Sequence, residues 1–125
     1  MDKQEQKGGR RLRVAENLMH LAAEFFRVES NHQSLITITK ADLAPNFSES
    51  TIYFTVLPQS QEEHALNFAK RKRRDFKLYI KKRVSMKRIP FFDFAIDEGE
   101  KHRQRIEEIS HEIHAEDADD ESTES

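Results

Sequence analysis

The chain is organised around residues 66–96, which run LNFAKRKRRDFKLYIKKRVSMKRIPFFDFAI. From Lys70 to Arg88 this stretch carries eleven basic residues and one acidic residue, Asp75, in a protein whose formal net charge is -2. Cations at this density repel one another unless a polyanion neutralises them. The alternative interpretation is a solvated, charge-rich helix face. Phosphate binding is favoured, because a basic segment in a small domain most often contacts nucleic acid.

The same stretch predicts a helix followed by a strand. The helix is expected to begin at Ser60, which has Glu63 at the spacing of a capping box. Apolar residues then recur at helical spacing, except within the wholly basic segment Lys70–Arg74. Either one long helix is exposed on all sides there, or the chain kinks. Pro90 interrupts the helical pattern, and the alternation of residues 91–97 predicts a strand.

The preceding residues predict a helix and a hairpin. Apolar residues at spacings of three and four favour a helix over residues 11–28. Two runs rich in β-branched residues, 35–43 and 51–57, are separated by a short polar turn and predict an antiparallel hairpin. The overall order is helix, strand, strand, helix, strand, helix. It predicts an α+β domain of two layers, in which a three-stranded sheet packs on helices.

A last helix is predicted after residue 97, with an apolar stripe too narrow to fold alone. The stripe consists of Ile106, Ile109 and Ile113. Residues 1–9 are polar with a Gly-Gly pair, and residues 115–125 carry six acids and no base. Both segments are predicted to be disordered. The folded domain is therefore expected to span residues 10–114.

The composition argues against several classes of protein. The absence of cysteine excludes a disulfide framework, a thiolate zinc site and a cysteine nucleophile. It is consistent with a reducing compartment, and we expect a cytoplasmic location. The N-terminus lacks the apolar region of a secretory signal, and no apolar run approaches the length that spans a bilayer. We expect a monomer that does not bind membranes.

Nothing in the sequence predicts an active site. His111, Glu112 and His114 form an H-E-x-H cluster, but this spacing is a weak signal for a metal, and exposed histidines are the better interpretation. The chain has three glycines, too few for a loop that cradles a nucleotide phosphate. We therefore expect no enzyme, no metal and no cofactor.

Four stretches together carry a family resemblance. They are GRRLRVAENL at 9–18, ITITKADLAPNF at 36–47, TIYFTVL at 51–57 and RIPFFDFAID at 88–97. In this order and spacing they resemble the ribosome-binding factor A family of bacterial small-subunit assembly factors, over residues 10–113. The resemblance implies a type II KH-like fold without a GXXG loop. It also implies binding to rRNA of the small subunit during late maturation.

The sequence departs from this family at one point. The resemblance implies an Ala-x-Gly kink between two helices, which falls here on Lys72-Arg73-Arg74, with neither alanine nor glycine. A continuous helix and a differently bent one therefore both stay open. The substitution replaces small residues by positive charge, which favours contact with rRNA phosphates.

Together these observations predict a ribosome biogenesis factor that binds the pre-small ribosomal subunit and assists rRNA maturation without catalysis. The residues predicted to contact RNA are Arg10, Arg11, Arg13, Lys40, Lys70, Arg71, Lys72, Arg73, Arg74, Lys77, Lys81, Lys82, Arg83, Lys87 and Arg88. Arg83 lies near the apolar residues of its own predicted helix, so packing is a second role for it.

Two questions about partners stay open at this stage. Phe91 and Tyr53 are candidates for stacking on unpaired bases, although core or edge packing is the favoured interpretation. The alternative function is a protein–protein adaptor that uses the basic helix and the isoleucine stripe. A steep fall of affinity with salt would distinguish RNA binding from the adaptor.

Overall fold

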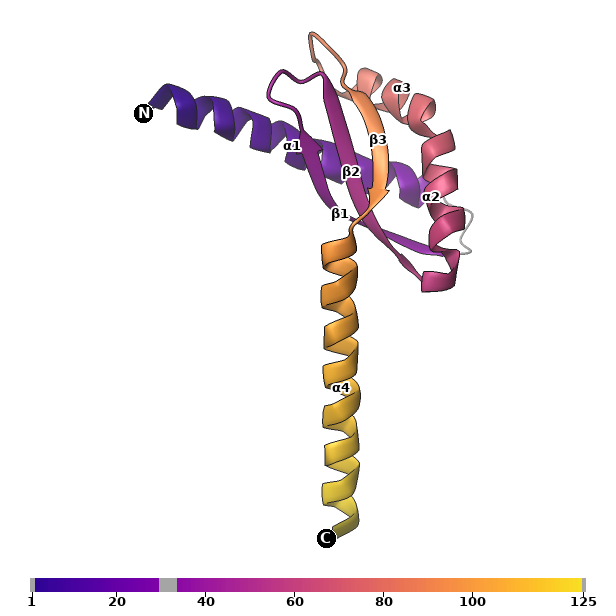
Figure 1. Ribbon diagram of the computed structural model, residues 1–125. Coiled ribbons are helices and arrows are strands. Elements are labelled where there is room, and N and C mark those ends of the chain that lie inside the picture. The colour runs from indigo at the N-terminus through magenta and orange to yellow at the C-terminus, as the bar shows by residue number, and fades with distance from the viewer. Residues whose placement is uncertain (1, 30–33, 125) are drawn as a thin grey trace.

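The computed structural model describes residues 2–29 and 34–124, and the side chains of residues 9–29 and 34–113 (Figure 1). Its elements are α1 (Asp2–Glu29), β1 (Leu35–Leu43), β2 (Glu49–Leu57), the short 3-10 helix η1 (Gln59–Gln61), α2 (Glu62–Arg71), α3 (Arg73–Arg83), β3 (Phe91–Ile96) and α4 (Glu98–Glu124). The predicted order of helices and strands is confirmed, with the second helix divided in two.

The sheet has the order β1-β2-β3. β1 and β2 are antiparallel, which confirms the predicted hairpin, and β3 runs parallel to β2. Figure 1 shows α1 crossing one face of the sheet, while α2 and α3 stand along β3. β1 and β3 are therefore the two edges of the sheet, and α2 and α3 lie beside only one of them.

Edge-to-face aromatic contacts join the two layers. The ring centroid of Phe76 on α3 lies 4.8 Å from that of Phe92, 5.3 Å from Phe25 and 5.5 Å from Phe94. Phe94 also lies 5.1 Å from Phe26. All five side chains are buried. Phe92 and Phe94 occupy alternate positions of β3, the strand that the alternation of residues 91–97 predicted.

A β-bulge at Thr39 sets which side chains of β1 face the core. Strict alternation continued from buried Ile38 would bury Lys40 and Asp42 and would expose Leu43. The register of β1 against β2 shifts between Ile38 and Lys40, so Thr39 is an extra residue. As a result Leu43 is buried, and both charged side chains are exposed.

The question of a kink is settled at Lys72. α2 ends at Arg71 and α3 begins at Arg73, and Lys72 between them has φ -92° and ψ 6°. Its N–H donates to the carbonyl oxygens of Phe68 at 3.2 Å and Ala69 at 3.0 Å. Because φ is negative, this conformation is open to any residue. The kink therefore needs neither the alanine nor the glycine of the family pattern.

Several boundaries differ from those predicted. β2 begins at Glu49 rather than at residue 51. α1 begins at Asp2 rather than near residue 11, since a Gly-Gly pair lowers helix stability without forbidding a helix. α2 has Gln61 as its N-cap with no side-chain cap, because Ser60 lies within η1. α4 continues to Glu124 rather than ending near residue 114. No proline or glycine follows Gly99 to interrupt it.

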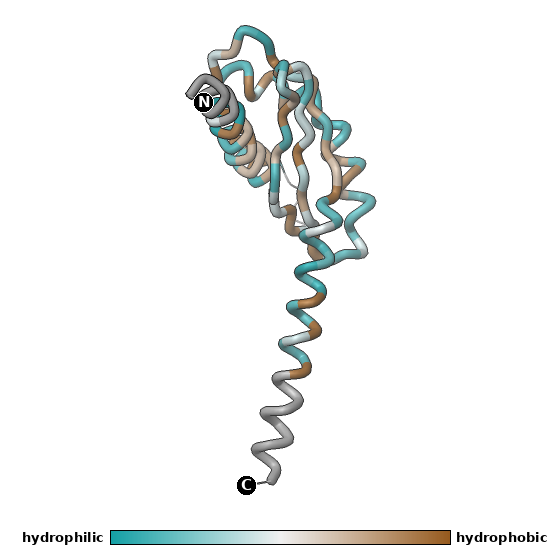
Figure 2. Tube along the Cα trace, turned by 60° about the vertical axis from the view of Figure 1, so that its left-hand side comes forward, coloured by the Kyte–Doolittle hydropathy of each residue, from teal (hydrophilic) through white to brown (hydrophobic). Residues whose placement is uncertain are grey.

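Asp97 fixes the first turn of α4 to the sheet. Its Oδ2 accepts a hydrogen bond of 2.6 Å from the Thr39 hydroxyl, and its Oδ1 accepts one of 3.0 Å from the backbone N–H of Glu100. Its own N–H donates to the carbonyl oxygen of Phe54 at 2.8 Å. The bulge residue Thr39 thus joins the cap of α4. Beyond this turn α4 runs away from the sheet (Figure 2).

We expect replacement of Asp97 by alanine to lower the free energy of unfolding by about 1–2 kcal/mol, the usual range for a lost N-cap. The hydrogen bond from Thr39, followed by that from the Glu100 N–H, lowers the pKa of the Asp97 carboxyl. Because this pKa is lower in the folded state, the ionised carboxyl stabilises the fold at pH values above its unfolded pKa of about 3.9. This stability is lost as the pH falls through the folded pKa. Urea unfolding at neutral and acidic pH measures both effects.

Asp97→Asn is the control, because asparagine also caps helices but does not titrate. It should retain most of the stability at neutral pH and lose less of it on acidification. If the wild type and Asp97→Ala lost stability in parallel as pH falls, Asp97 would contribute nothing to the pH dependence.

Candidate nucleic-acid interface

One face of α2 and α3 carries a row of exposed cations. Three of them are spaced by three and four residues on one side of α3, and the fourth lies on α2, before the kink at Lys72. They are Lys70, Arg74, Lys77 and Lys81. From Arg74 to Lys81 the row extends about 10 Å along α3, at 1.5 Å per residue. We call these four residues the basic row.

The basic row lines two neighbouring grooves. The first has a volume of about 340 Å³ and is lined by Lys70, Arg71, Arg73, Arg74, Lys77, Phe91 and Phe92. The second, of about 500 Å³, is lined by Lys77, Lys81, Val84, Ser85, Met86, Lys87 and Ile89. Lys77 lines both grooves, so the positive surface continues from one to the other.

Few acids neutralise this surface. Asp93 Oδ1 lies 3.4 Å from Arg73 Nη1 and 3.8 Å from Lys70 Nζ. Of the side chains that the structure describes, none forms an ion pair with Arg74, Lys77 or Lys81. Three of the four members of the basic row thus present uncompensated charge.

Two other residues that were predicted to contact RNA, Lys72 and Arg83, have partners within the fold. Lys72 is half-buried, with Nζ 3.5 Å from Glu29 Oε2 and 3.6 Å from Asp75 Oδ2. The Arg83 guanidinium lies 3.5 Å from the ring centroid of Tyr79 and donates to its carbonyl oxygen at 3.3 Å. Lys72 joins the start of α3 to α1, and Arg83 packs on its own helix. The second role predicted for Arg83, packing, agrees with its place on Tyr79.

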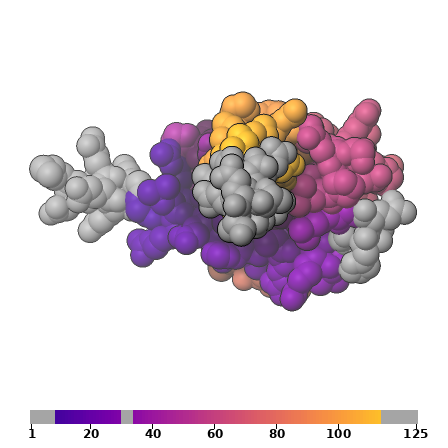
Figure 3. Space-filling view, turned by 90° about the horizontal axis from the view of Figure 1, so that it is seen from below, coloured from indigo at the N-terminus to yellow at the C-terminus, as the bar shows by residue number. Residues whose placement is uncertain are grey.

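The remaining predicted cations do not gather at the basic row. Arg10, Arg11 and Arg13 lie on the N-terminal half of α1, and Figure 3 shows this half and α2–α3 on opposite sides of the molecule. Lys40 lies on β1, at the other edge of the sheet from β3, over the ring of Tyr53 and 3.7 Å from Asp42. Lys82 and Arg88 are exposed but do not line either groove.

Phe91 differs from the favoured interpretation of the sequence. It was expected to pack as core or edge cover, but its side chain is 62% exposed. The reason is its outward position on an edge strand, where no element of the described chain covers it. The Arg73 guanidinium lies 5.6 Å from its ring centroid. The signal in the sequence was an outward aromatic directly after the basic segment. Tyr53, the second candidate, is half-buried beneath Lys40.

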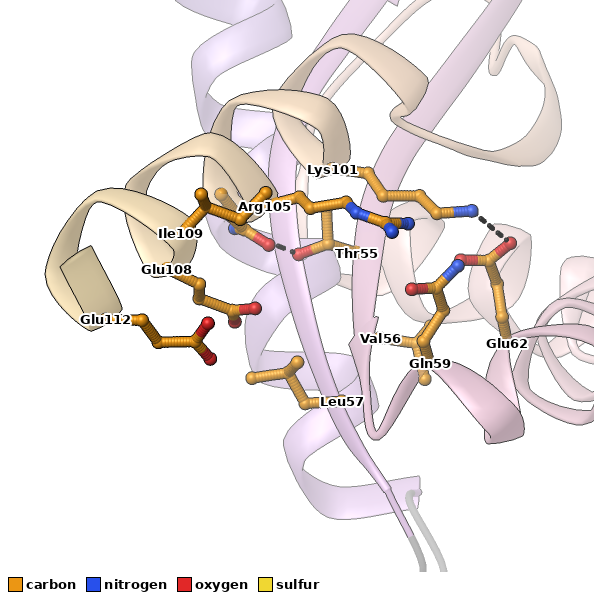
Figure 4. A pocket seen from close by; sticks show the side chains of 11 residues that line it. Thr55, Val56, Leu57, Gln59, Glu62, Lys101, Arg105, Glu108, Ile109 and Glu112 are labelled. Carbon is orange, nitrogen blue, oxygen red and sulfur yellow. Dashed lines mark hydrogen bonds and ion pairs between the residues drawn. The ribbon is translucent and has the colours of Figure 1, made fainter. Parts of the chain in front are cut away.

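A third groove lies at the base of α4 and has a different character (Figure 4). Its volume is about 500 Å³. The Lys101 ammonium lies 3.1 Å from Glu62, and the Gln104 amide donates to the Thr55 hydroxyl at 3.5 Å. Since its charges are of both signs and partly paired, this groove does not favour a polyanion.

Within the described side chains, no three histidine, aspartate or glutamate residues are arranged to hold a metal. His111 and Glu112 are exposed on α4, and the side chain of His114 lies outside the described residues. None of the described helices is long and apolar enough to cross a membrane.

Comparison with known proteins gives one family throughout. A family model described as ribosome-binding factor A matches residues 10–110. Proteins of that name from Bradyrhizobium sp. (strain BTAi1) and Neisseria gonorrhoeae are 30% and 29% identical, over 80% and 78% of this chain and 76% and 81% of their own.

Solved structures agree with this result. Ribosome-binding factor A from Thermus thermophilus superposes with a TM-score of 0.63 at 23% identity, over 69% of this chain and 93% of that chain. A homology model of the Thermus thermophilus protein, fitted into a cryo-EM map of its 30S complex, superposes with a TM-score of 0.58 at 24% identity, over 65% of this chain and 88% of that chain. The predicted KH-like fold is thereby confirmed, and the chain belongs to the ribosome-binding factor A family.

Proposed function

We propose that this protein binds the immature small ribosomal subunit and that the basic row contacts rRNA phosphates. The observation that carries the proposal is the basic row, in which Arg74, Lys77 and Lys81 form no ion pair with any side chain that the structure describes. The family supports it, because a related protein was fitted into a map of its complex with the 30S particle. In this proposal the protein acts as a cytoplasmic monomer.

The charges at the start of α3 are hard to explain by stability alone. Cations are unfavourable near a helix N-terminus, and Arg73 and Arg74 occupy the first turn of α3. No side chain caps this turn, although Asp75 provides one acid within it. An rRNA phosphate would offset this repulsion. The cost to the free protein therefore supports a function that needs the charge.

The proposed mechanism contains no chemical step. Phosphate contacts release counterions and position a protein without reading bases. The kink at Lys72 and the β3 edge give the positive surface a shape, so that it fits one arrangement of rRNA better than others. By favouring that arrangement, binding assists late rRNA maturation.

The test is binding of the purified protein to immature small subunits, mature small subunits and free duplex RNA across a salt series. We expect preference for a ribosomal particle and a steep linear fall of log affinity with log salt. Equal weak binding to all three would leave a nonspecific basic domain. An absence of RNA binding would favour the adaptor function.

Protein binding by α4 is a second candidate function, favoured by one observation. Ile106, Ile109 and Ile113 are 51%, 47% and 53% exposed on a helix that leaves the sheet. Leu57, which lines the same groove as Ile109, is 51% exposed. Such a stripe fits the side of another helix. On a ribosomal particle, a ribosomal protein would be its partner.

Replacing Ile106 and Ile113 together by glutamate separates the two functions. If α4 contacts a ribosomal protein, affinity for the particle should fall about tenfold or more, since each isoleucine buries apolar area. Affinity for free RNA should change little. Ile106→Leu with Ile113→Leu is the control and should retain particle binding. Equal losses for particle and free RNA would argue against a protein contact by α4.

A further inference from the structure

Phe91 is an exposed aromatic ring that the fold holds in place. Its side chain is 62% exposed, whereas the adjacent Pro90 and Phe92 are buried. The Phe91 backbone N–H donates to the carbonyl oxygen of Ser48 at 3.0 Å, and the residue pairs with Glu49 in the sheet. A phenylalanine left in water at a fixed position gains from burial against a flat apolar partner.

The surroundings of the ring are cationic. Phe91 lines the first groove together with Lys70, Arg74 and Lys77 of the basic row. Arg73, whose guanidinium lies 5.6 Å from the ring centroid, is held by Asp93. An apolar ring with ammonium and guanidinium groups around it matches a ligand that has a flat face and anionic flanks. A nucleotide has both.

We propose that Phe91 is the stacking platform for one unpaired base of RNA, and that Lys70, Arg74 and Lys77 hold the phosphates beside it. This inference rests on the proposed function and names the kind of RNA that the site takes. Bases in an A-form duplex are stacked within the helix, so only a loop, a bulge or a strand end can present one to the ring. A groove of about 340 Å³ is at the lower end of small-molecule sites, which suits one base.

The stacking contact makes the site selective for strandedness rather than for sequence. Every base has a flat face, so stacking on an aromatic ring tolerates all four. Phosphate contacts by lysine and arginine also carry no sequence information. We therefore expect preference for single strands over duplexes and little difference between base compositions.

A tryptophan at this position gives a direct measurement. The protein contains no tryptophan, so Phe91→Trp introduces the only one. We expect its fluorescence to be quenched when a short single-stranded RNA binds, and to change little with an abasic oligonucleotide of the same length and charge. A blunt duplex should likewise bind through phosphates with little quenching.

Affinity measurements by fluorescence anisotropy of labelled RNA give the second test. Phe91→Ala should weaken binding of single-stranded RNA about five- to a hundredfold, the range for loss of one stacked base. Binding of the abasic oligonucleotide should be unchanged. Phe91→Tyr should retain the affinity, whereas Phe91→Leu, which keeps an apolar side chain without an aromatic face, should lose most of it.

The outcomes separate this inference from the function on which it rests. If the protein prefers ribosomal particles but the tryptophan is not quenched, or if Phe91→Leu binds as well as the wild type, stacking is wrong and the proposed function stands. If no RNA binds, both fail. If polyglutamate of matched charge competes as well as single-stranded RNA, the site recognises charge alone and the inference is overturned.

Discussion

Replacement of Phe76 by alanine is expected to destabilise the fold by about 3–5 kcal/mol, the range for loss of a buried aromatic ring. Phe76 is fully buried and contacts three other rings, those of Phe25, Phe92 and Phe94. Removing it leaves a cavity where α1, α3 and β3 meet. Domains are stable by about 5–15 kcal/mol, so the variant would lose a large part of its stability.

Urea unfolding followed by circular dichroism measures this loss. Phe91→Ala is a matched control, because it makes the same chemical change on a ring that is 62% exposed. We expect Phe91→Ala to change the free energy of unfolding by less than about 1 kcal/mol, as surface substitutions usually do. Similar losses for both variants would mean that Phe76 does not hold the layers together.

The elements of this core could be predicted because their signals are local. Alternation in β2 and β3 and the three-four spacing in α1 depend only on neighbours along the chain. The bulge at Thr39 is different. It joins a residue of β1 to Asp97, which lies 58 positions further along the sequence. Only the folded chain brings the two together, so alternation alone would misplace the residues after Ile38.

The candidate site likewise has features that local sequence predicts and contacts that only the folded chain brings together. Charge density located the basic segment, and helical spacing is enough to group Arg74, Lys77 and Lys81. Only the fold shows that Lys70, before the kink, lines the same groove. Sequence could not show that Lys72 would pair with Glu29, 43 positions earlier, or that Arg83 would lie against Tyr79. It grouped Lys40 with the other cations by charge alone, although the structure places it at the opposite edge of the sheet.

The basic row is expected to dominate RNA affinity. Replacing Lys70, Arg74, Lys77 and Lys81 together by glutamine should weaken binding about a thousandfold near 0.1 M salt, since each phosphate contact contributes roughly 0.7–0.9 of a power of ten there. The slope of log affinity against log salt should fall by about three to four, because each contact accounts for 0.7–0.9 of it. Titrations at several salt concentrations measure both quantities.

A second set of four cations provides a control of equal charge. Arg10, Arg11, Arg13 and Lys40, replaced together by glutamine, lower the net charge by the same amount but lie away from the basic row. We expect this set to reduce the salt slope by less than the basic row does. If both sets reduced the slope equally, affinity would follow net charge, and the site would not be confined to α2 and α3.

Because cations of the basic row repel one another, the variant that lacks them should unfold at no lower urea concentration than the wild type. A loss of RNA binding in that variant would then report on the interface itself.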